Sequence, residues 1–276
     1  MTNPKGARPS HKGRKRRLNF KRLFLFCILL GVLFITACSG AALCLFADSD
    51  ATTEQKAAVA SLGSRLGRII FLRDAVENKL QRHDYTTIDQ MPQYLKNAVV
   101  AVEDNRFYEH RGFDLTGIAR ASLVNLQKGE VAEGASTITQ QLVKNLFLSP
   151  EQTLGRKAEE LLLALDMEAH YDKEEILELY LNSIYFGSNF YGITAAARGY
   201  FGKEPKDLNL AEAALLAGLP NAPSLYSPYV DFLLAKKRQF VVLESMVAHG
   251  YLTKKTAEDA KIEPLELAKK NPPKGE

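Results

Sequence analysis

Two short stretches bring reactive side chains close together along the chain. Residues 101–112 read AVEDNRFYEHRG and put the carboxylate of Glu103 directly after a run of apolar residues. Residues 134–141 read GASTITQQ and combine a leading glycine with hydroxyl and amide side chains. A carboxylate can act as a general base, and a glycine-led helix start can bind an anion through its free N–H groups. Together the two stretches predict group transfer on a sugar phosphate rather than simple binding.

Glu103 is the candidate general base, because it ends an apolar helix that we expect to begin at Pro92. The buried stripe of that helix is expected to consist of Leu95, Ala98, Val99 and Val102. The helix dipole and partial burial both disfavour the charged carboxylate and raise its pKa. A raised pKa makes a better base near neutral pH. The alternative is an exposed turn carboxylate, which is the commoner state of a lone glutamate.

The neighbours of Glu103 are expected to support it. Asp104 is predicted to cap the next turn, Phe107 to pack in the core, and His110 to be a structural hydrogen-bond donor more than a catalyst. Phe107 and His110 are also kept as substrate-binding candidates.

The second stretch is predicted to open a helix whose core face repeats every four residues, at Ile138, Leu142 and Leu146. Thr137, Gln141 and Lys144 fall on the other side. Lys144 could reach a bound phosphate as a point charge. The pattern alone is weak evidence for a phosphate site, because Ser and Thr also cap ordinary helices.

A third group of charges follows at Arg156, Lys157 and Glu160, whose spacing allows pairing on one helix face. Such groups are usually solvated ion pairs that contribute little. The apolar run Leu161–Leu165 follows at once, so we expect the start of this helix to line a cleft. Two cations and a carboxylate there could hold a diphosphate leaving group.

The N-terminus predicts a membrane anchor. Residues 1–22 carry nine Lys or Arg and no Asp or Glu, and Leu23–Phe46 contain no charge, so a basic cytoplasmic tail (1–22) precedes a transmembrane anchor (23–46). The alternative is a cleaved lipoprotein signal with lipid on Cys38, but the apolar run continues past that residue. Removing the nine basic residues from 36 leaves 27, against 32 acidic ones, so the basic balance gives no case for nucleic acid. All three cysteines lie within the anchor, so the outer part can form no disulfide.

Helical patterns dominate from Pro92 onward, which predicts a mainly α domain at 85–250. We expect a stem at 47–84 with a short strand near 68–72, and a C-terminal tail at 251–276. Capping signals predict helix starts at Ser149 and Asp172. Further helices are expected at Leu210–Ala217 and from about Val230 to His249, the second ending at Gly250.

Five motifs, in order along the chain, resemble glycosyltransferase family 51, the peptidoglycan polymerases that occur alone or as half of class A penicillin-binding proteins. They are Glu103–Gly112 (EDNRFYEHRG), Gly134–Gln141 (GASTITQQ), Arg156–Glu160 (RKAEE), Ile176–Gly187 (ILELYLNSIYFG) and Ala195–Lys203 (AAARGYFGK). The last continues into Leu210–Pro220 and Pro223–Pro228. The resemblance covers roughly residues 85–250.

The resemblance implies a lysozyme-like α fold with a globular head and a small membrane-associated jaw at about Arg111–Glu133. The jaw's apolar residues would be Leu115, Ile118, Leu123, Val124 and Leu126. The substrate would be lipid II, which is joined to a growing glycan strand. The site would be the bacterial cytoplasmic membrane, with the catalytic domain on its extracytoplasmic side. Partners would be the membrane and other cell-wall synthesis proteins. No cofactor is required, and a divalent cation (Mg²⁺ or Mn²⁺) at the pyrophosphate is left open.

The resemblance also assigns roles. Glu103 would take the proton of the acceptor hydroxyl, and Glu160, also counted as catalytic, would orient the cations or contact substrate. Lys144, Arg156 and Lys157 would stabilise the departing pyrophosphate. The donor side would be lined by Ser136, Thr137, Gln140 and Gln141. Glu178 and Asn182 are assigned to the scaffold.

Two other functions stay open, a membrane-anchored glycan hydrolase and a non-enzymatic scaffold. The cation cluster favours transfer from a pyrophosphate, since a hydrolase of neutral glycan has no use for it. The chain has no Ser-x-x-Lys and no Lys-Thr-Gly, so we expect no transpeptidase activity in it. Whether the chain is a natural single-function enzyme or part of a bifunctional one is left open.

Overall fold

A computed structural model describes residues 72–80, 84–128, 134–151 and 153–268. The chain separates into two compact units, Met1–Leu66 and Gly67–Glu276, and all described residues belong to the second. The predicted cytoplasmic tail, anchor, Cys38 and most of the predicted stem, including its strand up to residue 71, lie outside the described residues. Within the described residues, no helix has the length and apolar character needed to cross a membrane.

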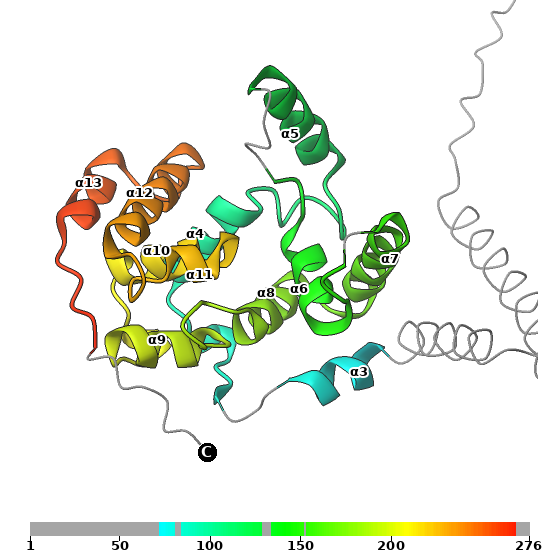
Figure 1. Ribbon diagram of the computed structural model, residues 1–276, viewed down its shortest axis with the longest axis horizontal. Coiled ribbons are helices and arrows are strands. Elements are labelled where there is room, and N and C mark those ends of the chain that lie inside the picture. The colour runs from blue at the N-terminus through cyan, green and yellow to red at the C-terminus, as the bar shows by residue number, and fades with distance from the viewer. Residues whose placement is uncertain (1–71, 81–83, 129–133, 152, 269–276) are drawn as a thin grey trace, which may run out of the picture. The chain divides into compact units, whose positions relative to one another are not determined.

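The second unit is mainly α, as the periodicity predicts, and its described residues contain only isolated β-bridges. The α-helices, shown in Figure 1, are α3 (Leu72–Lys79), α4 (Gln93–Glu103), α5 (Leu115–Lys128), α6 (Ile138–Phe147), α7 (Leu154–His170), α8 (Lys173–Ser183), α9 (Ile193–Phe201), α10 (Leu210–Gly218), α11 (Pro223–Tyr226), α12 (Phe232–Ala248) and α13 (Lys254–Ile262). Short 3₁₀ turns lie at Ile88–Gln90, Pro205–Asp207 and Leu219–Asn221.

Side-chain caps explain where several helices begin. Asp172 and Glu175 form the predicted capping box at α8, in which each side chain accepts from the other residue's backbone N–H. Helix α10 has the same arrangement at Asn209 and Glu212. The predicted start at Ser149 was wrong, because α7 begins at Leu154 and the Thr153 side chain accepts from the Arg156 N–H. A second hydroxyl residue four positions later supplies the cap.

The helices pack in two groups that share one hydrophobic core. Helices α4, α10 and α12 pack on one another, and α6 packs on both α7 and α8. Of the apolar residues predicted for α4, Leu95, Ala98 and Val99 are fully inaccessible, and Val102 is partly buried against the core. Helix α5 stands apart from both groups in Figure 1. The C-terminal end of α4 and the start of α6 therefore face each other between the two groups.

Two helices lie in segments predicted as a stem and a tail. Leu72 and Val76 of α3 are part of the core, and the Arg73 guanidinium lies 5.1 Å from the centre of the Tyr171 ring. Ala257 and Ala260 of α13 are buried as well, where α13 packs on α12. Short amphipathic helices of this kind have too few apolar positions to stand out in the sequence.

Candidate functional site

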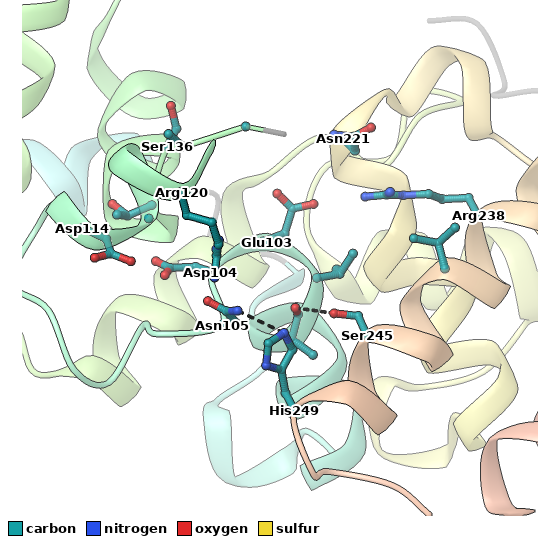
Figure 2. A pocket seen from close by; sticks show the side chains of 17 residues that line it. Glu103, Asp104, Asn105, Asp114, Arg120, Ser136, Asn221, Arg238, Ser245 and His249 are labelled. Carbon is teal, nitrogen blue, oxygen red and sulfur yellow. Dashed lines mark hydrogen bonds between the residues drawn. The ribbon is translucent and has the colours of Figure 1, made fainter. Parts of the chain in front are cut away.

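A pocket of about 420 Å³ lies where the end of α4, α5, the loop before α6, and α12 meet. Figure 2 shows Glu103 near its centre, with Arg120 and Ser136 on one side and Asn221 and Arg238 on the other. Ser245 and His249 of α12 border it below Glu103 in the same view. Residues far apart in the sequence thus surround the carboxylate that the sequence predicted as a base.

Glu103 is held by one carboxylate oxygen and leaves the other without a partner. Its Oε2 accepts a hydrogen bond of 2.8 Å from the Gln141 side chain, and its Oε1 is buried with no hydrogen-bond partner among the described residues. Burial raises the pKa of Glu103 above the ordinary value of 4.5. The Gln141 hydrogen bond and the charges of Arg238 and Lys144 oppose this rise. The result is a poised carboxylate with a free oxygen, as a general base requires.

Tyr180 orients the amide that holds Glu103. Its hydroxyl donates to Oε1 of Gln141 over 3.1 Å, so the amide nitrogen of Gln141 faces the carboxylate. Burial, together with the nearby charges of Glu103 and Asp104, raises the pKa of Tyr180 well above 10, so the hydroxyl remains a donor. Tyr180 lies on α8, and Gln141 on α6. The chain Tyr180–Gln141–Glu103 therefore links three helices at the reactive carboxylate.

Asp104 ties the end of α4 to the start of α6. Its carboxylate accepts from Nε2 of His110 at 2.9 Å and from the backbone N–H of Ile138 at 3.0 Å. Asp104 and His110 are both buried. The sequence predicted that Asp104 caps the next turn, and this was wrong: its side chain accepts from the first N–H of α6, which begins 34 positions later in the sequence. His110 bonds to Asp104, which fits the structural role predicted for it.

The start of α6 is already satisfied by protein groups. Thr137 and Gln140 form a capping box, and the Thr137 hydroxyl donates to the carbonyl of Gly112 over 2.8 Å. Gly112 has a φ of +75°, and a Cβ there would lie 3.0 Å from the Ala164 backbone, so only glycine fits. With Ile138 bonded to Asp104 and Gln140 to Thr137, few N–H groups remain for an anion. The predicted phosphate cradle is therefore mainly a wall of the pocket, to which Ser136 and Thr137 contribute.

Arg156, Lys157 and Glu160 meet on α7, as their spacing predicted. The Glu160 carboxylate is only 2% exposed, and it accepts from Nη1 of Arg156 at 2.8 Å and from Nζ of Lys157. Lys157 also donates to the Ser136 hydroxyl over 3.3 Å, and its side chain is 48% exposed. Because Ser136 lines the pocket, this contact links the charged cluster to the pocket's edge. Lys144 is exposed on the adjacent helix α6.

Some of the predicted site residues line the pocket, and others do not. Glu103, Ser136 and Thr137 line the pocket. Phe107 is fully buried, with the Lys173 ammonium 4.4 Å from its ring centre. Phe107, His110 and Gln140 are all buried and do not line the pocket in the described part of the chain. They hold the elements that carry the exposed groups.

Arg238 and Tyr180 were not predicted as functional residues. Arg238 lies in a run of three basic residues, which in a sequence is typical of a solvated helix face. Tyr180 occupies an apolar stripe position, where the spacing predicts only a core residue. Neither pattern contains a local signal for an effect on Glu103, because Arg238 and Tyr180 lie on other helices than Glu103.

The carboxylates around the pocket do not fit a resident metal ion. The described residues contain no group of three or more His, Cys, Asp or Glu side chains arranged to hold one. Asp104 is bonded to His110 and Ile138, and Glu160 is paired with two cations. No step is therefore assigned to a metal held by these side chains.

Comparisons with known proteins identify the family. A family model described as transglycosylase matches residues 72–247. Penicillin-binding protein 1A of Aquifex aeolicus is 48% identical over 192 residues, which cover 70% of this chain and 26% of that protein. Penicillin-binding protein 1A of Neisseria flavescens is 50% identical over 185 residues, covering 67% and 23%.

Among solved structures, penicillin-binding protein 1A from Haemophilus influenzae is similar with a TM-score of 0.40 and 26% identity, covering 68% of this chain and 18% of that one. The chain spans about a quarter of the length of the curated relatives it matches. The family model covers well over half of this chain, and the five motifs lie within its match. The chain therefore belongs to the transglycosylase family of glycosyltransferases.

Proposed function

We propose that this chain is a peptidoglycan glycosyltransferase. It polymerises lipid II into β-1,4-linked glycan with inversion at the anomeric carbon and release of undecaprenyl pyrophosphate. The observation that carries the proposal is the Glu103 carboxylate, which faces the pocket with one oxygen free and lies within the charge field of Arg238 and Lys144. The family membership of the chain supports the class of reaction.

Glu103 acts as the general base. Its free Oε1 takes the proton of the acceptor's GlcNAc 4-hydroxyl, and that oxygen bonds to C1 of the donor MurNAc. The bond from C1 to the pyrophosphate oxygen breaks, and the pyrophosphate leaves with the electron pair. The Gln141 hydrogen bond keeps the carboxylate aimed during this exchange.

The leaving group is stabilised by cations. Arg156 and Lys157, held in place by the buried carboxylate of Glu160, offer a fork and a point charge to the pyrophosphate oxygens. Lys144 adds a third positive charge from α6. Glu160 positions these cations, since both of its oxygens are already occupied by them.

The donor strand lies along Ser136, Thr137 and Gln141. Ser136 presents a hydroxyl at the pocket's edge, and Gln141 reaches both Glu103 and Tyr180. Gln140 supports this wall through its capping box, and Phe107 and His110 support it from the core, so direct contacts with substrate are assigned to the other residues.

Helix α5 is the membrane-facing jaw of a lysozyme-like fold. Its Leu115, Leu123 and Leu126 are 69%, 57% and 81% exposed, which is costly in water and favourable at a lipid surface. The substrate carries a polyprenyl chain, so the pocket must stay near a bilayer. The uncharged segment 23–46 anchors the chain in the bacterial cytoplasmic membrane, with the N-terminus in the cytoplasm.

A polymerisation assay tests the proposal. Labelled lipid II in detergent is expected to give long glycan with the wild-type chain and none with Glu103→Gln. Release of short saccharides from finished glycan, without polymer formation, would instead identify a hydrolase. Unreduced polymerisation by Glu103→Gln would overturn the base assignment.

A further inference from the structure

Helix α12 contacts the chain on both sides of Glu103. The Ser245 hydroxyl donates to the carbonyl of Ala101 over 2.6 Å, and the Asn105 amide nitrogen lies 3.0 Å from Nε2 of His249. Figure 2 shows both hydrogen bonds directly below the Glu103 carboxylate. Ala101 is two residues before Glu103, and Asn105 is two residues after it.

The two contacts have the same register. Each joins residues 144 positions apart, so the spacing from Ser245 to the C-cap His249 of α12 matches the spacing from Ala101 in α4 to Asn105 just beyond it. Arg238, Val241 and Ser245 of α12 and its C-cap His249 all line the pocket. Arg238 also donates from Nε to the carbonyl of Gly218 at the end of α10 over 3.2 Å, which fixes this face at its other end.

The end of a helix is its least constrained part. The last four carbonyl groups of α4 have no intrahelical partner, and one of them belongs to Ala101. The Val100 carbonyl is used by the N–H of Asp104, and the Ala101 carbonyl is used by Ser245. The backbone on both sides of Glu103 is thereby held by a helix that begins more than 120 positions later in the sequence.

From this arrangement we infer that Ser245 and His249 are positioning residues for the proposed base. The inference rests on the proposed function, since it assigns them to the aim of Glu103. Neither residue contacts the carboxylate. They act through Ala101 and Asn105, while Gln141 holds the carboxylate itself. Base catalysis requires this precision, because a misplacement of about 1 Å can cost about 100-fold in rate.

The two contacts from Ser245 and His249, here called the clamp, also limit the access of water to Glu103. The charged or titratable groups around that carboxylate are Asp104 next to it in the sequence, Lys144 on α6, Arg238 on α12 and Tyr180 on α8. Loosening the end of α4 admits solvent without removing any of these groups. The pKa of Glu103, which burial raises, then falls toward its ordinary value, and the acid limb of the pH–rate profile moves to lower pH.

The test compares the full-length wild-type chain with Ser245→Ala, His249→Ala and the double variant Ser245→Ala/His249→Ala in the lipid II assay. The double variant is expected to lose kcat by about 10- to 100-fold with KM nearly unchanged, and to shift its acid limb to lower pH. Ser245→Thr, which keeps the hydroxyl, and His249→Gln, which keeps an acceptor, are expected to restore most of the rate.

A matched control is Thr253→Ala, which removes the hydroxyl that caps the start of α13 and does not line the pocket. It is expected to lower thermal stability about as much as Ser245→Ala without moving the acid limb. Wild-type kcat and an unmoved acid limb in the double variant would overturn the inference, and so would equal losses in the control.

A second measurement separates this inference from the proposed function. If the wild-type chain forms no polymer, the proposed function fails, and the clamp is judged by amide hydrogen exchange alone. Faster exchange in the double variant, confined to the amides around Ala101–Asn105, is the expected result. Unchanged exchange there would show that α12 does not hold the end of α4.

Discussion

Glu103 and Glu160 are the same residue type in two opposite environments. Glu160 is buried with both oxygens paired, one to Arg156 and one to Lys157. Glu103 has one oxygen bonded to an uncharged amide and the other free. The nearest cations act on Glu103 only through space. The charge of Glu160 is thus balanced by two cations, and Glu103 keeps one oxygen that can accept a proton.

The difference shows how one side chain is assigned two roles. A carboxylate with a cation on each oxygen does not take a proton easily, which fits the proposed role of Glu160 in holding Arg156 and Lys157. A carboxylate that is desolvated but underbonded has a raised pKa and an open acceptor. Glu103 is the last residue of α4 and Glu160 lies in the second turn of α7, and neither position by itself predicts this contrast.

The largest expected effect is the loss of the proposed base. Glu103→Gln removes the acceptor of the proton and is predicted to lower the polymerisation rate by about 10²- to 10⁴-fold. The variant keeps the shape of the side chain, so its thermal unfolding temperature is expected to be at least as high as that of the wild type. If Glu103→Gln also unfolds the chain, Glu103 stabilises the fold as Glu160 does, which would contradict the contrast between the two glutamates.

The second largest effect is expected at Glu160, on the stability of the fold. Glu160→Gln leaves Arg156 and Lys157 without their counter-charge, and we expect a loss of about 2 kcal/mol in the free energy of unfolding measured with urea. This is less than for a fully buried pair, because the Lys157 side chain is about half exposed. Glu258→Gln on α13, which breaks a surface pair with Lys261, is the control and should change stability by less than about 0.5 kcal/mol. Equal losses for the two variants would contradict the assignment.

The pH dependence of stability gives a third comparison. Because the pKa of Glu103 is raised above 4.5 in the folded chain, the folded state binds this proton more tightly than the unfolded state. Stability therefore falls as the pH rises from 4.5 through the folded pKa. Glu103→Gln lacks this dependence, so its stability relative to the wild type should increase over that window and match it at lower pH. Urea denaturation at several pH values measures this, and a constant difference would contradict it.

The smallest effect is expected at the link between the two regions. Ser136→Ala removes one hydrogen bond of 3.3 Å to the half-exposed Lys157. We predict a change in stability of a few tenths of a kcal/mol and a change in KM of about twofold or less. Titration with lipid II measures it. A change in KM above about tenfold would mean that the hydroxyl, and not the charges of the cluster, determines binding on that side.

The sequence predicted the helices that carry strong periodicity or a cap. Helices α4, α8, α10 and α12 were predicted within a few residues, because their apolar stripes and capping residues are local features. The start of α7 was wrongly predicted at Ser149. Both Ser149 and Thr153 could cap a helix there, and the sequence pattern does not show which of them does. Helix α13 was missed because only Ala257 and Ala260 mark its buried face.

The sequence alone determined which side chains could do chemistry, since Glu103, Lys144 and the Arg156–Glu160 group follow from residue type and spacing. Only the tertiary structure decided what each one contacts. Glu103 is bonded by Gln141 of α6, which is oriented by Tyr180 of α8, and it feels the charge of Arg238 of α12. The start of α6 is capped by Asp104 and Thr137. The physical reason is that burial and charge at a point in space depend on segments brought together by packing, and spacing along one helix carries no record of them.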